Sequence, residues 1–363
     1  MTDLAVLAER VLPVLAFLVA ITVVAEICDL AGVFDEAAHL AAKVARGRVV
    51  VLWLLIVALA CASTILLSLD TTAVLLTPVA VTVANQVGVP PLAFAMTTLW
   101  LANTASLLLP VSNLTNLLAL HHFTALGLSV NEYVALLWPP ALTAIVLTVV
   151  VLWLIHRRDL RGRYDRPPRA EPHDRTLMVV SAVVAAALAP AFVAGITPAW
   201  PAIAAALVLL AVAALRAPML VRRISVPWKA ALGVAVLFVV VDLALSAGLG
   251  PWLTEVVGSG TGTAELLRLG SIGAASANAI NNLPAYLALE VTADQSPVRL
   301  AALLIGVNAG PIVTMWGSLA TILWAQRCRA AGVTVSWRRL AVTGLACAVV
   351  VVTGSTLALA LTA

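Results

Sequence analysis

Residues 102–116 read Ala-Asn-Thr-Ala-Ser-Leu-Leu-Leu-Pro-Val-Ser-Asn-Leu-Thr-Asn. This polar stretch lies in the middle of an apolar run from Leu92 to Leu120, which is longer than one membrane-spanning helix needs. An unbroken helix facing lipid does not place so many amides and hydroxyls beside a proline, because freed backbone groups find no partner in lipid. The stretch therefore predicts a helix that is broken inside a membrane, where its backbone is buried in protein or lines a cavity.

The composition of the whole chain is that of a membrane protein. Of 363 residues, 63% are hydrophobic and 10% are charged, and the mean hydropathy is +1.08, whereas a soluble domain carries roughly 25% charged residues. Apolar runs recur from Val11 to Ala360, and runs such as Val179–Leu188 do not alternate in polarity as the strands of a membrane barrel do. We therefore expect an all-α polytopic membrane protein whose first segment is not a cleaved signal peptide.

The order of apolar and polar segments predicts about eight full spans, two re-entrant hairpins and two broken transmembrane helices, with both termini outside. A first repeat covers residues 8–155, with a hairpin at 49–88 whose tip is near Asp70, and a broken helix at 92–120. Residues 156–229 are expected to form a cytoplasmic loop and two linking spans.

A second repeat is predicted over residues 230–361, with a hairpin at 266–290 and a broken helix at 298–324. The same sequence offset relates four pairs of residues: Asn103 with Asn308, Asn113 with Ser318, Leu114 with Leu319, and Asn116 with Thr321. Because one half starts outside and the other inside, the repeats are inverted, an arrangement in which hairpin tips and helix breaks meet near the midplane.

Charged residues indicate the orientation. The loop Arg157–Arg175 holds seven arginines and no lysine, which is typical of a cytoplasmic connection. Residues 29–48 read as an amphipathic helix on the cytoplasmic surface. The net charge of +4 therefore reports orientation and does not indicate a nucleic-acid partner. Glu26 and Asp29 are expected at the membrane edge, in contact with solvent.

Polar residues at the hairpin tips and helix breaks are the candidate substrate-binding groups, although Ser, Thr and Asn also join membrane helices as structural contacts. The candidates are Ser68, Thr71, Thr72, Asn103, Ser112, Asn113, Asn116, Ser276, Asn278, Asn281, Asn282, Asn308, Ser318 and Thr321.

Two ionisable residues inside predicted membrane segments, Asp70 and Asp242, are candidates for proton coupling. Repeat symmetry predicts that Asp70 and Asn282 face one cavity. The four cysteines have no paired spacing, and His121 and His122 are expected in solvent, so neither a cofactor nor a metal site is predicted. No Walker loop is present, so ATP hydrolysis by this chain is not expected.

Five motifs together resemble the arsenical pump membrane protein (ArsB) family of the ion transporter superfamily. They are Leu69–Pro78, Ala102–Asn116, Asn281–Ala285, Gly306–Pro311 and Gly317–Thr321. The resemblance implies a secondary transporter, not an enzyme, that exports arsenite and antimonite from the cytoplasm by proton antiport across the bacterial plasma (inner) membrane.

The resemblance also implies partners. These are arsenite or antimonite, protons, membrane lipid, and in some members a cytosolic ATPase subunit; a homodimer is a further candidate assembly. Members of the family have two more spans before the position of Val11, which this sequence does not show.

Other functions remain open. Hairpin Asp and Asn side chains suit a sodium/proton antiporter or an anion carrier of the same superfamily equally well. Arsenous acid is neutral and presents three hydroxyls, which Asn, Ser and Thr can satisfy, and the absence of Lys and Arg from the clusters weakens the case for a di- or trianion. An intramembrane enzyme would need Asp70 and Asp242 to face one another, and a channel fits paired hairpins less well than alternating access does.

Overall fold

The computed structural model describes residues 4–164, 174–194, 196–224, 228–244, 247–248 and 250–363. From the N-terminus, the helices of the first half are α1 (Leu4–Leu30), α2 (Val33–Val44), α3 (Val49–Leu66), α4 (Leu69–Thr71), α5 (Thr77–Gln86), α6 (Pro91–Thr104), α7 (Leu114–Ala125) and α8 (Val130–His156).

The remaining helices follow the arginine-rich connection, of which residues 165–173 lie outside the described residues. They are α9 (Arg175–Val193), α10 (Ala199–Arg216), α11 (Pro218–Val221), α12 (Trp228–Ala244), α13 (Gly250–Val257), α14 (Thr263–Ile280), α15 (Asn282–Leu289), α16 (Pro297–Ala309), α17 (Leu319–Ala330) and α18 (Trp337–Thr362).

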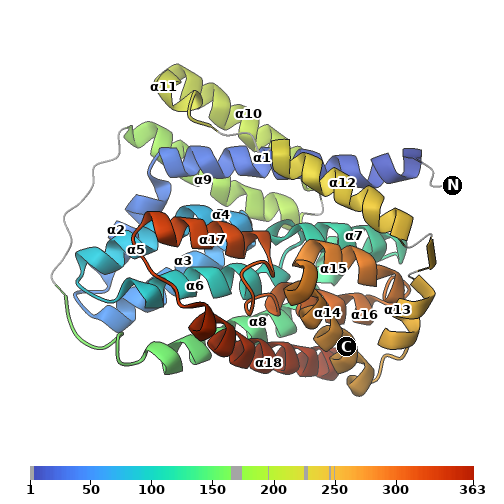
Figure 1. Cartoon of the computed structure of the whole chain (residues 1–363). Helices are drawn as coiled ribbons and strands as arrows, with labels where there is room; N and C mark the ends of the chain where they lie inside the picture. Colours follow the sequence, from blue (N-terminus) through green and yellow to red (C-terminus); the bar gives the residue numbers. More distant parts are fainter. Residues whose placement is uncertain (1–3, 165–173, 195, 225–227, 245–246, 249) are drawn as a thin grey trace.

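The helices form a narrow layer beside a larger bundle (Figure 1). The layer consists of α1, α9, α10 and α12, with α1 in contact with the other three. In the bundle, α14 packs against α16 and α18 packs against α8. Helices from both halves of the chain therefore share one core.

The helix break expected between Leu92 and Leu120 lies between α6 and α7. Pro110 has no amide hydrogen and disfavours helical geometry at the residue before it, and Leu109 is extended, with φ −116° and ψ 146°. The chain resumes as α7 after Asn113, whose side chain accepts a hydrogen bond from the Thr115 amide. In the second half, residues 310–318 separate α16 from α17.

The two expected hairpins are each a helix, a sharp break and a returning helix. The first turns at Leu67 and Ser68, so Asp70 lies in the first turn of the returning helix, not at the turn itself. That helix continues through a π-helical segment, Thr72–Leu76, into α5. The widened turn precedes Pro78, which cannot donate the backbone hydrogen bond of a regular α-helix.

Four described helices are long and apolar enough to cross a membrane: α3, α8, α10 and α18. A fifth candidate is the pair formed by Leu15–Leu30 and α2, which are bent by 56°. The sequence predicts about eight spans, so the described helices account for part of that number. α16 belongs to an expected broken span and is by itself shorter than a membrane crossing needs.

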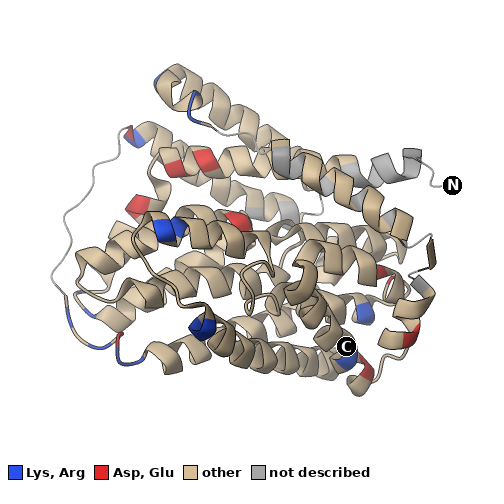
Figure 2. Ribbon diagram, viewed as in Figure 1, with Lys and Arg blue, Asp and Glu red and all other residues tan. Residues whose placement is uncertain are grey.

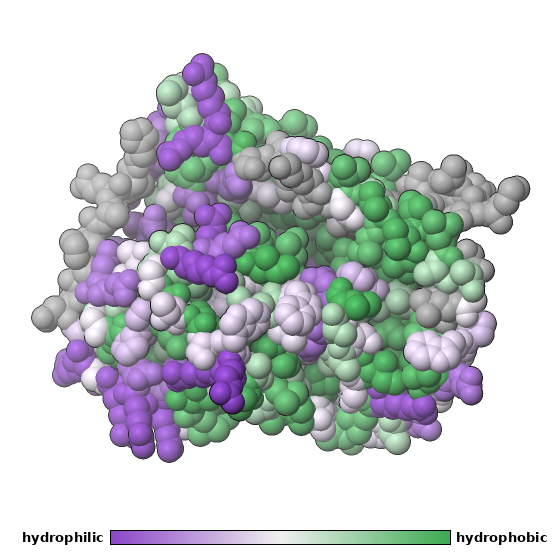
Figure 3. Space-filling view, in the orientation of Figure 1, coloured by the Kyte–Doolittle hydropathy of each residue, from purple (hydrophilic) through white to green (hydrophobic). Residues whose placement is uncertain are grey.

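Basic residues gather at one end of the molecule, where α17 ends and α18 begins (Figure 2). The described start of the arginine-rich loop lies at this end as well, because the backbone of Arg163 forms an isolated antiparallel β-bridge with that of Arg48, in the turn between α2 and α3. Figure 3 shows hydrophilic residues concentrated at the same end of this face and hydrophobic residues over much of the rest. α2 is amphipathic as expected, and the apolar side chains of Leu40 and Val44 are exposed.

Candidate functional site

A cavity lies between α1 and the broken elements of the bundle, and it has two lobes that share part of their lining. The first lobe has a volume of about 210 Å³ and the second of about 240 Å³. The residues common to both lobes are Leu18, Leu69, Asp70, Asn113, Leu114 and Leu319. Asp70 and Asn113 are the polar residues of this shared wall, so they lie where the lobes meet.

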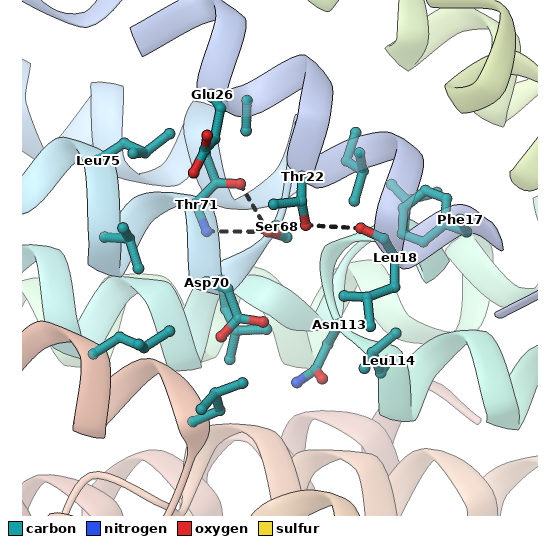
Figure 4. A pocket seen from close by; sticks show the side chains of 17 residues that line it. Phe17, Leu18, Thr22, Glu26, Ser68, Asp70, Thr71, Leu75, Asn113 and Leu114 are labelled. Carbon is teal, nitrogen blue, oxygen red and sulfur yellow. Dashed lines mark hydrogen bonds between the residues drawn. The ribbon is translucent and has the colours of Figure 1, made fainter. Parts of the chain in front are cut away.

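Asp70 projects into the cavity from the first turn of α4 (Figure 4). The turn is held by Ser68, whose hydroxyl oxygen accepts a hydrogen bond from the Thr71 amide at 3.1 Å. The buried Oδ1 atom of Asp70 has no hydrogen-bond partner among the described residues. Buried polar atoms are usually paired, so this unpartnered oxygen marks Asp70 as a candidate for a functional role.

The hydroxyls around Asp70 form two groups. Ser68 and Thr71 line the first lobe, and their hydroxyl oxygens are 2.9 Å apart, with either able to donate. Thr72 is fully buried and instead bonds to Thr64 and Ser63, at 2.8 and 2.9 Å. Thr72 therefore fastens the returning helix to α3.

A buried asparagine network joins the two halves beneath the cavity. Asn308 on α16 accepts hydrogen bonds at Oδ1 from Asn113 Nδ2 at 2.9 Å and from Thr115 Oγ1 at 2.7 Å. Its own Nδ2 donates to Asn116 Oδ1 at 2.6 Å. Asn116 Nδ2 donates in turn to the carbonyl oxygens of Ser106 and Leu109 in the break. The network fixes the first break against the second half and presents Asn113 to the cavity.

The second hairpin is held by amide side chains. Asn278 donates to the Gly310 carbonyl at 2.8 Å and accepts from the amides of Val313 and Thr314 at 3.2 and 3.1 Å. Asn281 forms the turn with a φ of 87°, a strained value for a residue with a side chain, and donates to the Trp316 carbonyl at 2.9 Å. These bonds hold the second break against the hairpin tip.

Four helices begin at the second lobe, which is lined by Asp70 of α4, Leu114 of α7, Asn282 of α15 and Leu319 of α17. Each helix has a side-chain cap at its start: Ser68, Asn113, Asn281 and Ser318. The N-terminus of a helix carries a partial positive charge. The helix starts therefore contribute partial positive charge to the second lobe, whose described lining includes the carboxylate of Asp70.

The candidate residues from the sequence separate into two groups. Those lining the cavity are Ser68, Asp70, Thr71, Asn113, Asn281 and Asn282. Asp70 and Asn282 line one lobe, as repeat symmetry predicts. Those that are not among its described lining residues are Thr72, Asn103, Ser112, Asn116, Ser276, Asn278, Asn308, Ser318 and Thr321. Asp242 lies on α12, and its side chain is outside the described residues.

The structure also places residues in this site that the sequence did not suggest. Thr22 and Glu26 of α1 line the first lobe opposite Ser68 and Thr71 (Figure 4). Glu26 is thus a cavity residue, contrary to the expected position in solvent at the membrane edge. Thr115 belongs to the asparagine network. The signal for Glu26 was present, because an ionisable residue near the end of a 27-residue apolar helix is costly unless it serves a site.

The lining residues suit hydrogen bonding better than metal binding. Within the part of the chain that the structure describes, no group of three or more His, Cys, Asp or Glu could hold a metal ion. Lys and Arg are also absent from the described lining of both lobes. The site can satisfy a ligand with hydroxyls and can hold one or two protons on carboxylates.

The chain is similar in sequence to known transport proteins. Residues 2–296 match the family model CitMHS, described as citrate transporter. The arsenical pump membrane protein of Escherichia coli K12 is 30% identical over 345 residues, covering 89% of this chain and 80% of that protein. The arsenical pump membrane protein of Yersinia enterocolitica is 29% identical with the same coverage.

The fold is similar to that of a solved transporter. The crystal structure of the Alcanivorax borkumensis YdaH transporter, described as revealing an unusual topology, matches with a TM-score of 0.56 and 16% identity. The match covers 98% of this chain and 86% of that chain.

Proposed function

The chain belongs to the citrate transporter (CitMHS) family of the ion transporter superfamily, and from that premise we propose that it exports arsenite and antimonite in exchange for protons. Family membership makes it a multi-pass membrane protein and a secondary transporter rather than an enzyme. We place it in the bacterial inner membrane, with the basic end of Figure 2 in the cytoplasm.

The proposal includes two inverted repeats, each with a re-entrant hairpin and a broken helix. It is supported by the returning helices after Ser68 and Asn281 and by the breaks before Asn113 and Ser318. All four resumed helices start at one cavity that lies between the bundle and the α1 layer. Half-helices that meet at a substrate site are the geometry in which alternating access moves one repeat or bundle against another.

The observation that carries the substrate assignment is the chemistry of the cavity wall. It offers hydroxyls and amides from Ser68, Thr71, Asn113 and Asn282, and its described lining includes no basic side chain. Arsenous acid is neutral near neutral pH and presents three hydroxyls that can both donate and accept. Such a solute needs hydrogen-bonding groups and no buried cation, which is what the wall supplies.

Asp70 is the proposed coupling group. The Asp70 side chain lies where the lobes meet, so a proton and a substrate hydroxyl compete for the same carboxylate. Competition for one group makes binding of the two ligands mutually exclusive, which is the requirement for antiport.

An anion carrier is the second candidate, because four helix starts favour negative charge. Each start contributes roughly half a positive charge, so together they balance Asp70 and about one further negative charge. A citrate-like trianion carries more negative charge than the helix starts balance, so it would require accompanying cations. The monoanion of an oxyacid would require none.

Uptake into everted membrane vesicles with an imposed pH gradient, acidic inside, tests the assignment. Arsenite, antimonite, citrate and sodium are offered separately, with vesicles from cells lacking the protein as the control. We expect pH-driven accumulation of arsenite and antimonite. Accumulation of citrate or sodium without arsenite would replace the proposal with one of the two alternatives.

A further inference from the structure

Two acidic residues follow one another along the same side of α1, towards the basic end of the molecule. Glu26 and Asp29 are three residues apart, so they are neighbours on one helix face. Glu26 lines the first lobe together with Asp70. Asp29 is half-buried one turn further along. Carboxyl groups thus extend from the centre of the cavity to the end of α1.

We propose that Glu26 transfers protons between Asp70 and the cytoplasmic surface, as the exit of the proton path. This role rests on the proton coupling by Asp70 proposed above and adds a residue to it. Glu26 need not bind substrate. It accepts the proton that Asp70 loses and then releases it towards Asp29.

The space between Glu26 and Asp70 can conduct a proton. Ser68 and Thr71 lie between the two carboxyl groups (Figure 4), and their hydroxyls are 2.9 Å apart with interchangeable donor and acceptor roles. The lobe they share, of about 210 Å³, is larger than a single water molecule requires. The hydroxyls of Ser68 and Thr71, together with water that enters the lobe, would supply exchangeable hydrogens between α4 and α1.

The outer end of the path has groups of both charges. Asp29 lies within electrostatic range of Glu26 on its own helix, Asp35 on α2 and Arg327 on α17. Arg327 lies in the last turn of α17, at the end that the positive-inside rule assigns to the cytoplasm. A proton arriving at Asp29 is therefore close to the surface and among groups that exchange with solvent.

The transfer conserves protons at every step. One proton leaves the Asp70 carboxyl, and the Glu26 carboxylate becomes protonated. Glu26 then loses a proton to Asp29 or to water, which regenerates its carboxylate. Each cycle moves one proton and leaves Glu26 unchanged.

The test measures how fast Asp70 takes up and loses a proton, which requires no substrate. The purified full chain in lipid is given a pH jump, and time-resolved infrared spectroscopy follows the carbonyl stretch of protonated Asp70. This band is assigned by its absence from the spectrum of the Asp70→Asn variant. We expect Glu26→Gln and Glu26→Ala each to slow this signal about 10-fold or more, since a positioned acid–base group commonly contributes ~10²–10⁴-fold. Glu26→Asp and the exposed control Glu255→Gln should stay close to wild type.

A second arm separates proton transfer from a structural role. A small weak acid such as azide, added in solution, should restore the rate in Glu26→Ala by carrying protons itself. An unchanged Asp70 rate in either folded variant, or slowing that azide does not restore, would overturn the proposal. Arsenite uptake by wild type is measured separately, so loss of the proposed substrate and loss of the proposed proton path are distinguishable results.

Discussion

Asn308 on α16 and Asn116 on α7 are joined by a 2.6 Å hydrogen bond between their side chains, although 192 positions separate them in the sequence. Both residues are fully buried. The bond connects the helix that ends at the second break to the helix that begins after the first. The two halves are thus linked directly beneath the cavity by polar groups.

Replacing Asn308 by Ala should destabilise the protein strongly. The change leaves Asn113 Nδ2, Thr115 Oγ1 and Asn116 Oδ1 without this partner, and a buried unpaired polar group costs about 1–3 kcal/mol. We expect a clear fall in the thermal midpoint of the purified protein. Asn85→Ala, at an exposed asparagine, is the control and should have little effect. Equal midpoints for the two variants would contradict the network.

Gly306 is required by the contact between α16 and α14. A methyl group added at Gly306 would meet the carbonyl oxygen of Gly270, which is backbone and cannot rotate away. We expect Gly306→Ala to lower the midpoint of unfolding, since overpacking typically costs about 1–3 kcal/mol. Gly233→Ala on α12 has open space around the added methyl and should be neutral or stabilising. A neutral Gly306→Ala would show that the helices can separate.

Much of this architecture could be predicted because prolines, amides and helix breaks coincide in the sequence. Pro110 and Asn113 mark the first break by the chemistry that ends and restarts a helix. Which polar residues line the cavity and which join helices could not be predicted. Thr71 and Thr72 are adjacent, yet one lines the cavity and the other bonds to α3. Their sides depend on how the returning helix packs, which local sequence does not specify.

The contribution of α1 to the cavity could not be predicted from the sequence either. Its apolar character predicted a span, and Glu26 near its end looked like an interfacial residue. The structure continues the helix to Leu30 and packs it across the broken elements, so Glu26 faces Ser68 and Thr71. Which face of a uniformly apolar helix meets the bundle is decided by tertiary contacts.

The arginine-rich connection should be inaccessible from outside the cell. A single cysteine in place of the exposed Arg158, with the four native cysteines replaced by alanine, provides the probe. A membrane-impermeant maleimide should label it in everted vesicles and not in intact cells. Labelling in intact cells would reverse the orientation and with it the assignment of Glu26 to the cytoplasmic path.

The start of α9 should loosen in acid. The pKa of the Asp174 carboxyl lies below its ordinary value. The larger cause is the hydrogen bond from the Leu177 amide, and the bond from Arg216 Nε at 2.9 Å adds to it. A lowered folded pKa means that these contacts stabilise the fold at neutral pH and are lost as the pH falls below about 3.9, the usual Asp value.

Hydrogen exchange of the α9 amides, corrected for its intrinsic pH dependence, measures this loosening. Protection in wild type should fall in acid, while Asp174→Ala, which removes the acceptor oxygens, should show the reduced protection already at neutral pH. Wild-type protection in that variant at neutral pH would show that the contact does not contribute.

The most direct test of the proposed mechanism is proton movement driven by arsenite alone. Proteoliposomes receive an arsenite gradient without a pH gradient, and an internal dye reports pH. Wild type and the control Asp294→Asn should move protons opposite to arsenite, while Asp70→Asn should exchange arsenite and move no protons, because its amide keeps the shape and lacks the titratable group. Proton movement by Asp70→Asn at the wild-type rate would contradict the account.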